Sequence, residues 1–368
     1  MQNKSMLNNA GKNPKYLQIY DRLKKNIIDA DYPFGSRLPS RKIMAEEQNV
    51  SVITIKHAYD LLCDEGYIES KERSGYYVIF RKEDGFLSSA PNIKPVKWQT
   101  DYDKTSLFPF SVLAKTMRRV MSDYGDLILE KAPNKGCLEF RDAIRKYLSR
   151  NRNIHVDTDQ IVVGSGSEYL YSLIVGLFGT DKTFALESPS YPKIEQVYHM
   201  AGVCCEFLPL GADGIESQAL SKSSSNILHI SPYRSFPSGV TASASKKHEY
   251  IRWASRPAHY IIEDDFESEF SLSSKPEETM FALSGNDNVI YMNTFSRTIS
   301  HSLRMGYMVI PKCLVKTFDE KLGFYSCTVP TFEQLVIAEL INNGDFERHI
   351  NRIRKNMRRE MNKQKGTP

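Results

Sequence analysis

Small and hydroxyl-bearing residues meet at Gly164-Ser165-Gly166-Ser167, where an apolar run ends and a helical pattern begins. Small residues at such a turn let backbone N–H groups approach an anion, and the positive end of the helix dipole attracts it. Any tight strand-to-helix turn has a similar sequence. Phosphate binding and an ordinary turn therefore both stay open for this segment.

Carboxylates end a second apolar run, Ile261-Ile262-Glu263-Asp264-Asp265-Phe266. Ligands of doubly wound sheets bind at the carboxyl ends of the strands, so this is a candidate site. Three acids could ligate a metal, but the sequence shows neither a nearby histidine nor a second acidic cluster to complete the ligand set. We expect no metal here.

Hydroxyl and guanidinium groups follow a third apolar run in Asn293-Thr294-Phe295-Ser296-Arg297, with Arg304 seven residues further. Such groups near one strand end are suited to holding a phosphate. The alternative is a surface loop with ordinary ion pairs.

The composition is that of an ordinary globular protein, with 41% hydrophobic and 25% charged residues among 368. No segment approaches the roughly 18 consecutive apolar residues of a membrane helix, and the polar N-terminus lacks the apolar core of a secretory signal. The six cysteines form no C-x-x-C pair, which disfavours a zinc or redox motif. The net charge of +5 is too small to prove nucleic-acid binding. We expect a soluble cytoplasmic protein without a membrane segment.

The elements before residue 81 predict a winged helix-turn-helix. A helix is expected over Lys15–Ala30, a second from Ser40, and a third from Ser51 to about Glu65, where Gly66 stops it. Two short strands, Tyr67–Glu69 and Tyr76–Phe80, would form the wing. A small helical protein-interaction module is the alternative.

In a winged helix-turn-helix the third helix enters the major groove of DNA. Its outward residues at the start are Val52, Ile53, Thr54, Lys56 and His57. The expected DNA contacts come from the second and third helices and the wing: Arg41, Lys42, Thr54, Lys56, His57 and Arg73.

Beyond a linker over residues 81–104, residues 105–368 alternate between helices and short apolar strands, which predicts an α/β domain around a largely parallel sheet. The strand candidates are Gln160–Val163, Thr183–Glu187, Cys205–Pro209, Asn226–Ile230, His259–Glu263, Val289–Asn293 and Gly306–Ile310. The clearest helices are Leu138–Ser149, Ser167–Phe178 and Ser245–Ala254.

Taken together, these segments resemble the MocR subgroup of GntR-type transcription regulators. That family fuses a GntR winged helix to a fold-type I aminotransferase domain that binds pyridoxal phosphate. In the first unit the similar stretches are Tyr16–Tyr20, Arg37–Ser40 and Glu65–Ser70. In the second they are Gln160–Ser167, Ser188–Pro192, Ser231–Gly239, Ile262–Phe270, Thr294–Ile310 and Phe346–Arg358.

The resemblance implies roles in cofactor binding. The turn at residues 165–167 would meet the phosphate together with Thr294 and Arg304, Tyr191 would stack on the pyridine ring, and Asp264 would face the ring nitrogen. The full set of expected cofactor-binding residues is Ser165, Gly166, Ser167, Tyr191, Asp264, Phe266, Thr294, Ser296, Arg297 and Arg304.

The chain departs from the family at several of these positions. Arg297 falls where the family has its Schiff-base lysine, and arginine stays protonated and forms no imine. Phe266 stands where a tyrosine usually contacts the ring oxygen, and Tyr233-Arg234-Ser235 replaces a polar Ser-His-Gln run. Val52 replaces a basic residue common at the start of the recognition helix, and Arg73 replaces a wing glycine.

We therefore expect a DNA-binding regulator with no catalytic residues. Its large domain would sense pyridoxal phosphate or an amino-acid-like anion. The cofactor would be held non-covalently only, or have been lost. Arg297 should point into the pocket and pair with Asp264 or reach the turn at Gly164–Ser167.

Two alternatives remain, a working pyridoxal-phosphate aminotransferase and a decayed paralogue that retains only DNA binding. The second follows from the end of the chain at Pro368, inside the helix that leads to the family's small C-terminal domain, so we expect that domain to be missing. The expected partners are double-stranded DNA, a small effector and a second copy of the chain.

Overall fold

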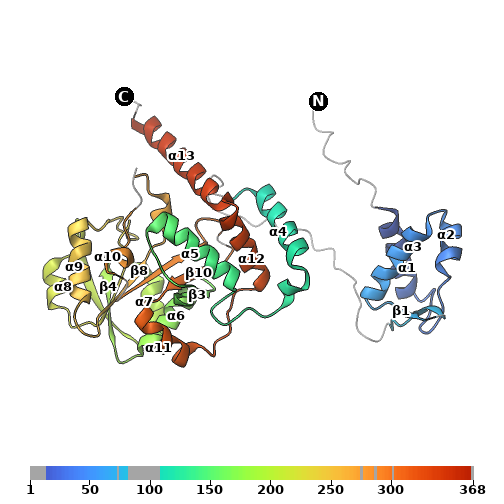
Figure 1. The fold of residues 1–368 in the computed structure, drawn as a ribbon, viewed down its shortest axis with the longest axis horizontal. Helices are drawn as coiled ribbons and strands as arrows, with labels where there is room; N and C mark the ends of the chain where they lie inside the picture. Colours follow the sequence, from blue (N-terminus) through green and yellow to red (C-terminus); the bar gives the residue numbers. More distant parts are fainter. Residues whose placement is uncertain are drawn as a thin grey trace. The chain divides into compact units, whose positions relative to one another are not determined.

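The computed structural model describes residues 14–72, 74–81, 108–273, 277–285, 288–300 and 302–365. By its internal contacts the chain divides into two compact units, Met1–Thr100 and Asp101–Pro368 (Figure 1). Each unit is described by itself. Arg73 and most of the expected linker lie outside the described residues.

The first unit contains three helices and a hairpin. They are α1 (Lys15–Ile28), α2 (Arg41–Gln48), α3 (Val52–Asp64) and the antiparallel strands β1 (Ile68–Lys71) and β2 (Gly75–Val78). The order of elements is the predicted one, although the wing turn is shorter because β1 continues to Lys71.

Side-chain caps start the second and third helices. Ser40 accepts a hydrogen bond from the backbone N–H of Ile43, and Ser51 accepts one from that of Thr54, which satisfies donors that a helix start leaves free. Between the two helices Asn49 adopts the left-handed conformation, with φ of 50°. This geometry makes the tight turn of the helix-turn-helix.

Residues of the GntR-like stretches hold α3 in place. The Tyr59 hydroxyl donates to the Pro39 carbonyl at 2.8 Å, and Lys24 pairs with Glu65 at 2.8 Å. Tyr20 also donates to Glu65, at 2.5 Å. Because Glu65 follows the last turn of α3, these bonds tie α1 to the end of α3.

The second unit is a three-layer α/β structure. The strands are β3 (Ile161–Gly164), β4 (Thr183–Ser188), β5 (Cys204–Gly211), β6 (Gly214–Ile215), β7 (Ile227–Ile230), β8 (Tyr260–Asp264), β9 (Val289–Thr294) and β10 (Gly306–Val309). The α-helices are α4 (Phe110–Tyr124), α5 (Leu138–Arg152), α6 (Ser167–Phe178), α7 (Pro192–Met200), α8 (Ser217–Lys222), α9 (Ala244–Ala254), α10 (Met280–Leu283), α11 (Lys312–Leu322), α12 (Thr331–Asn342) and α13 (Asp345–Lys365). The short 3₁₀ turns are η3 (Gly125–Leu129), η4 (Thr158–Gln160) and η5 (Ser268–Phe270).

The strands form one sheet in the order β3-β10-β9-β8-β7-β4-β5-β6. Pairing is parallel from β9 through β8, β7 and β4 to β5, and antiparallel where β10 joins β3 and β9. The prediction of a largely parallel sheet within an α/β fold is confirmed.

Successive side chains of a strand enter opposite core layers, as the pleat requires. In β3, Ile161 and Val163 join the core with α5 and α12, whereas Val162 joins the core with α6, α7 and α11. Helices therefore cover both faces (Figure 1), which is why these strands read as continuous apolar runs rather than alternating ones.

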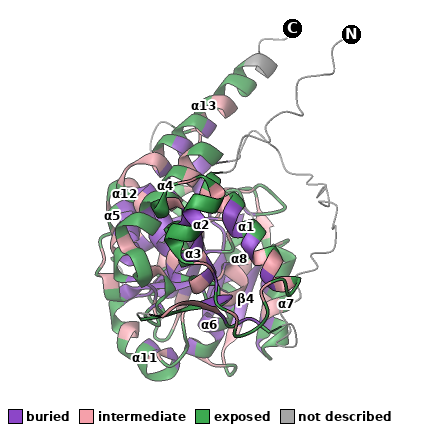
Figure 2. Cartoon of the chain, turned by 90° about the vertical axis from the view of Figure 1, so that its right-hand side faces the viewer, coloured by how far each residue is buried: buried purple, intermediate pink, exposed green. Residues whose placement is uncertain are grey.

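Among the described side chains of the C-terminal helix α13, the buried ones all lie in its first half. Phe346, Ile350 and Ile353 are buried, and from Arg354 to Asn362 none of the side chains is (Figure 2). Within the described residues, no helix has the length and apolar content that a bilayer-spanning segment needs.

A buried ion cluster joins α5 to the turn after β8. Arg152, at the end of α5, lies 3.0 Å from Asp265 and 3.5 Å from Glu269, and all three side chains are almost completely buried. Tyr291 donates to Asp265 at 2.8 Å, and Asn293 donates to Glu269 at 2.6 Å. Two acids near the predicted site therefore have structural partners.

Replacing Arg152 should destabilise the second unit strongly. Arg152→Met leaves two buried carboxylates without their cation, which typically costs about 3–5 kcal/mol. Urea unfolding followed by circular dichroism measures the loss. The control is Arg145→Met on the same helix, because Arg145 pairs with Asp142 at a side chain 39% exposed and should cost below about 1 kcal/mol. Equal losses in the two variants would contradict the structural role of Arg152.

Candidate effector and DNA-binding sites

The anion-binding turn predicted at Gly164–Ser167 connects β3 to α6. Gly166 precedes the helix with φ of 92°, a conformation that disfavours other residues. A side chain built at residue 166 would begin 3.5 Å from Nη2 of Arg304, so the arginine lies against the turn. The structure therefore brings Arg304 to the start of α6, 138 residues away in the numbering.

Strand register brings Thr294 to the same edge of the sheet. Gly306 of β10 pairs with Gly164 on one side and with Thr294 on the other. The ends of β3 and β9 therefore lie on the two sides of the start of β10. The expected phosphate contacts, which are the turn at residues 165–167, Thr294 and Arg304, are thus neighbours.

A carboxylate already occupies part of this region. Glu168, in the first turn of α6, lies 3.1 Å from Arg304 and also accepts a hydrogen bond from Lys193. The bond from Lys193 holds the pKa of Glu168 below its usual value. Arg304 consequently has an ionised partner within the protein, and an incoming anion would compete with that carboxylate.

Asp264 ends β8 and is held by a buried hydrogen-bond network. Its Oδ2 accepts from the Tyr171 hydroxyl at 2.5 Å, and Nε2 of His229 lies 3.6 Å from the same oxygen. The Tyr198 hydroxyl is 2.6 Å from Nδ1 of His229. Burial, followed by the charge of Asp264, raises the pKa of Tyr171 well above its usual value, so Tyr171 keeps its proton and donates.

The sequence did not predict the other three members of the Asp264 network, Tyr171, Tyr198 and His229. They come from α6, α7 and β7, and local sequence does not relate them to Asp264. The one available signal was His229 itself, a polar residue inside the apolar strand Ile227–Ile230. A polar side chain buried in a strand requires a partner, and that partner marks the site.

Arg297 pairs with Glu267 and not with Asp264, so the first of the two contacts expected for Arg297 is wrong. Nη1 of Arg297 lies 2.7 Å from Oε1 of Glu267, and its side chain is 47% exposed. The physical reason is that Asp264 is buried and already accepts from Tyr171. Glu267 lies closer to the surface, so an ion pair there requires less desolvation.

Arg234 approaches the same carboxylate from the loop after β7. Its Nη1 lies 3.5 Å from Oε2 of Glu267. The loop is fixed, because buried Glu187 accepts hydrogen bonds from the Ser231 backbone N–H and the Ser235 hydroxyl. Arg234 itself has φ of 50°, a conformation that costs energy in a residue other than glycine. Glu267 is thus placed between two arginines.

The remaining expected cofactor positions are Tyr191, Phe266 and Ser296, and in the described residues none of their side chains bonds to Glu267, Arg234 or Arg297. Tyr191 precedes α7, is 37% exposed and meets Phe236 edge-on, with 6.1 Å between ring centroids. Phe266 and Ser296 are partly buried. Their roles in ligand binding stay predictions.

Basic residues of the first unit are exposed as expected. Arg41, Lys42, Lys56 and His57 are all exposed. Thr54 is partly buried, and its hydroxyl is hydrogen-bonded to that of Ser51 at 2.8 Å, so its contact with DNA stays a prediction.

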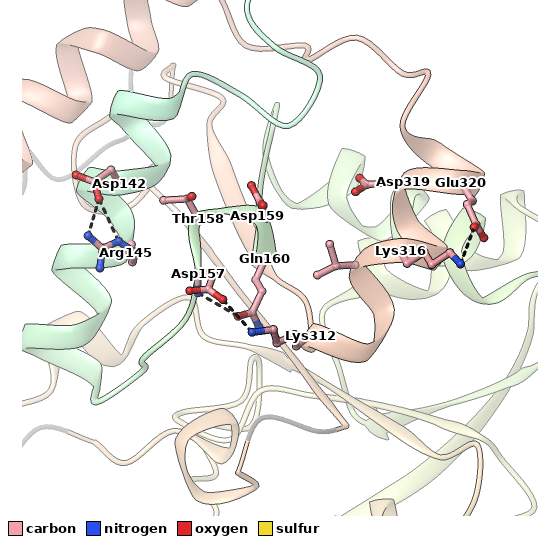
Figure 3. Close-up of a pocket in the computed structure, with 11 residues that line it drawn as sticks. Asp142, Arg145, Asp157, Thr158, Asp159, Gln160, Lys312, Lys316, Asp319 and Glu320 are labelled. Carbon is pink, nitrogen blue, oxygen red and sulfur yellow. Dashed lines mark hydrogen bonds and ion pairs between the residues drawn. The ribbon is translucent and has the colours of Figure 1, made fainter.

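A hollow of about 1040 Å³ in the second unit lies between α5, η4 and α11 (Figure 3). Several of its charged side chains pair with one another, as Lys312 with Asp157 and Arg145 with Asp142. None of the residues predicted to bind the cofactor lines it.

Comparison with known families identifies both units. Residues 15–78 match the family "Bacterial regulatory proteins, gntR family", and residues 99–364 match "Aminotransferase class I and II". The HTH-type transcriptional regulator YdeL of Bacillus subtilis is 30% identical over 94% of this chain and 77% of its own length. The probable rhizopine catabolism regulatory protein MocR of Rhizobium meliloti is 24% identical over 93% and 74%, respectively.

A solved structure of similar fold is the kynurenine aminotransferase of Pyrococcus horikoshii. It has a TM-score of 0.62 and 26% identity, and the match covers 67% of this chain. The chain spans 64% of the length of that aminotransferase. This similarity places the second unit in the aminotransferase fold.

A helix-turn-helix of the gntR family followed by an aminotransferase-like unit defines a class of transcription regulator. The chain belongs to the MocR-like regulators of the GntR family.

Stability should fall with rising pH because of Glu187. Burial raises the pKa of Glu187 to about 7, above its ordinary value of 4.5. The folded state therefore favours the protonated form, and this contribution is lost as the pH rises through about 7. Glu187→Gln keeps an acceptor without ionising. From about pH 5 to about pH 8, its unfolding free energy should rise relative to that of the unmodified protein, by about 3 kcal/mol at most. A pH-independent difference between the two proteins would contradict this.

Proposed function

We propose that the aminotransferase-like unit of this regulator binds a small anion without catalysis and that this binding alters its affinity for DNA. The observation that carries the proposal is the placement of Arg234 and Arg297 on the single carboxylate Glu267, in the loops that follow β7 and β9. Two exposed guanidinium groups that share one carboxylate have donors left for a bidentate anionic ligand.

Pyridoxal phosphate fits part of this site. Residues 165–167, Thr294 and Arg304 would hold its phosphate, and Asp264, fixed by Tyr171, would face its ring nitrogen. When bound, the group supplies an electron-accepting ring. Covalent attachment requires an amine, and the guanidinium of Arg297 stays protonated, so the proposal is non-covalent binding.

Catalysis is not part of the proposal. Transamination needs a residue that bonds to the cofactor and then moves a proton, and Arg297 does neither. The relatives YdeL and MocR support this part of the proposal, because both are named as regulators and not as enzymes. We also propose that two copies of the chain associate, as expected from the family.

Restoring lysine at residue 297 should convert non-covalent into covalent binding. The full-length protein is incubated with pyridoxal phosphate, reduced with borohydride and mapped by peptide mass spectrometry. Arg297→Lys should carry the cofactor mass at residue 297. The unmodified protein and Arg297→Ala should carry none there, although equilibrium dialysis should still detect bound cofactor.

The outcome that overturns non-covalent binding is a cofactor adduct on another lysine of the unmodified protein, at one equivalent per chain. Amino-acid-dependent turnover of the purified protein would overturn the absence of catalysis. Unchanged DNA affinity with and without saturating pyridoxal phosphate or a dicarboxylate would overturn the regulatory part.

DNA binding should depend on the exposed cations of α2 and α3. Lys56→Ala in the full chain should weaken binding to a selected duplex by about 1–3 kcal/mol if it contacts a base. Arg41→Ala and Lys42→Ala should each reduce the slope of log affinity against log salt by about 1, as expected for phosphate contacts. Fluorescence anisotropy measures both quantities.

The matched control is Lys25→Ala, which removes an exposed lysine from α1. It should leave the affinity close to that of the unmodified protein. Unchanged binding after replacement of Arg41, Lys42 and Lys56 together would contradict the proposed docking of α3 in the groove.

A further inference from the structure

Two aliphatic side chains lie exposed on the first turn of the recognition helix. Val52 is 47% exposed and Ile53 is 67% exposed. The helix does not lack a core face, because Ile55, Ala58, Tyr59 and Leu62 are all completely buried. The packing of the first unit therefore does not account for Val52 and Ile53.

The polar groups around this turn are already in use. The Ser51 side chain caps the helix by accepting from the Thr54 backbone N–H at 3.1 Å, and the Ser51 and Thr54 hydroxyls bond to each other. The cap fixes the backbone of the first turn, so the direction of Val52 and Ile53 is fixed as well. The groups that this turn offers to a partner are alkyl groups.

The surrounding charges indicate a polyanionic partner. Lys56 lies three residues after Ile53 and four after Val52, spacings that place side chains side by side on a helix. Lys56 is exposed, and the helix-turn-helix partner α2 begins with exposed Arg41 and Lys42. An apolar tip flanked by cations suits the floor of a DNA groove between two phosphate backbones better than it suits a neutral protein surface.

The major groove offers one apolar group, the C5-methyl of thymine, and residues at the start of a recognition helix contact base edges. Reading guanine there requires arginine or lysine donors, which Val52 and Ile53 lack. We propose that Val52 and Ile53 read thymine methyl groups, so that each half-site carries A·T pairs opposite the first turn of α3. This inference rests on the proposed DNA docking and adds which residues set base preference.

The test starts from duplexes selected by the full-length protein out of a random pool. Each thymine is then replaced by uracil, which removes one methyl group and leaves base pairing unchanged. At one or two positions of each half-site the affinity should fall roughly fourfold, the value of one buried methyl-sized group of about 0.8 kcal/mol.

Variants assign the effect to these side chains. In Ile53→Ser or Val52→Ser, which leave no methyl group to contact the base, uracil and thymine should bind equally at the position that the changed residue contacts. Ile79→Ala, which shortens another exposed aliphatic outside α3, should keep the fourfold difference. Cytosine at the same position should bind weakly, and 5-methylcytosine should recover part of the lost affinity.

Two results would overturn the inference while leaving DNA docking intact. The first is a selected duplex whose affinity does not respond to any thymine-to-uracil change. The second is a uracil penalty that is the same in the unmodified protein, Ile53→Ser and Val52→Ser, which would mean that other residues read the methyl group. Failure of the pool to yield any bound duplex would instead overturn the docking itself, and this inference with it.

Discussion

The buried contact of Arg152 with Asp265 and Glu269 fixes the acidic segment formed by the end of β8 and the turn that follows it. Because the pleat turns successive side chains to opposite faces, neighbouring carboxylates meet different partners. Glu263 accepts from the N–H groups of Met280 and Phe281, Asp264 accepts from Tyr171, and Asp265 meets Arg152. Each consecutive carboxylate has its own partner. A segment that could be a metal site by composition therefore acts as a junction between α5, α6 and α10.

This junction also explains why Glu267 is available to the arginines. Asp265 and Glu269 fasten the turn to the interior from both sides. Of the residues between them, Ser268 is also buried, whereas Phe266 and Glu267 are only partly buried. Glu267 is then within reach of the loops after β7 and β9, which supply Arg234 and Arg297. The exposed part of the site thus depends on a buried ion cluster that a ligand need not touch.

The fold followed from the sequence more completely than the site did. Apolar runs, capping serines and Gly66 specified the elements because those signals are local. The proximity of the turn, Thr294 and Arg304 was also predictable, since the turn and Thr294 lie at strand ends, and their role in phosphate binding stays a prediction. The partners of Asp264 and Arg297 were not identifiable, because Tyr171, His229 and Glu267 become neighbours only through the sheet order. The family's spacing placed Arg297 in the pocket across from Asp264, whereas the structure pairs Asp264 with Tyr171 and Arg297 with Glu267.

If Arg297 stands where the family has its lysine, as the resemblance implies, the aminotransferase fold is changed in what it can do. A lysine amine shifts its pKa on burial and exchanges protons, whereas a guanidinium keeps its charge and offers a fixed fork of donors. A guanidinium in the interior needs buried carboxylates, as Arg152 has in Asp265 and Glu269, whereas Arg297 pairs with Glu267 nearer to solvent. A ligand that displaces Glu267 would free a carboxylate on the turn held by Arg152 and α5. Binding of an anion would then leave an unpaired charge, that of Glu267, on a rigid turn. Under the proposed function, this change in charge is a physical basis for regulation without a catalysed reaction.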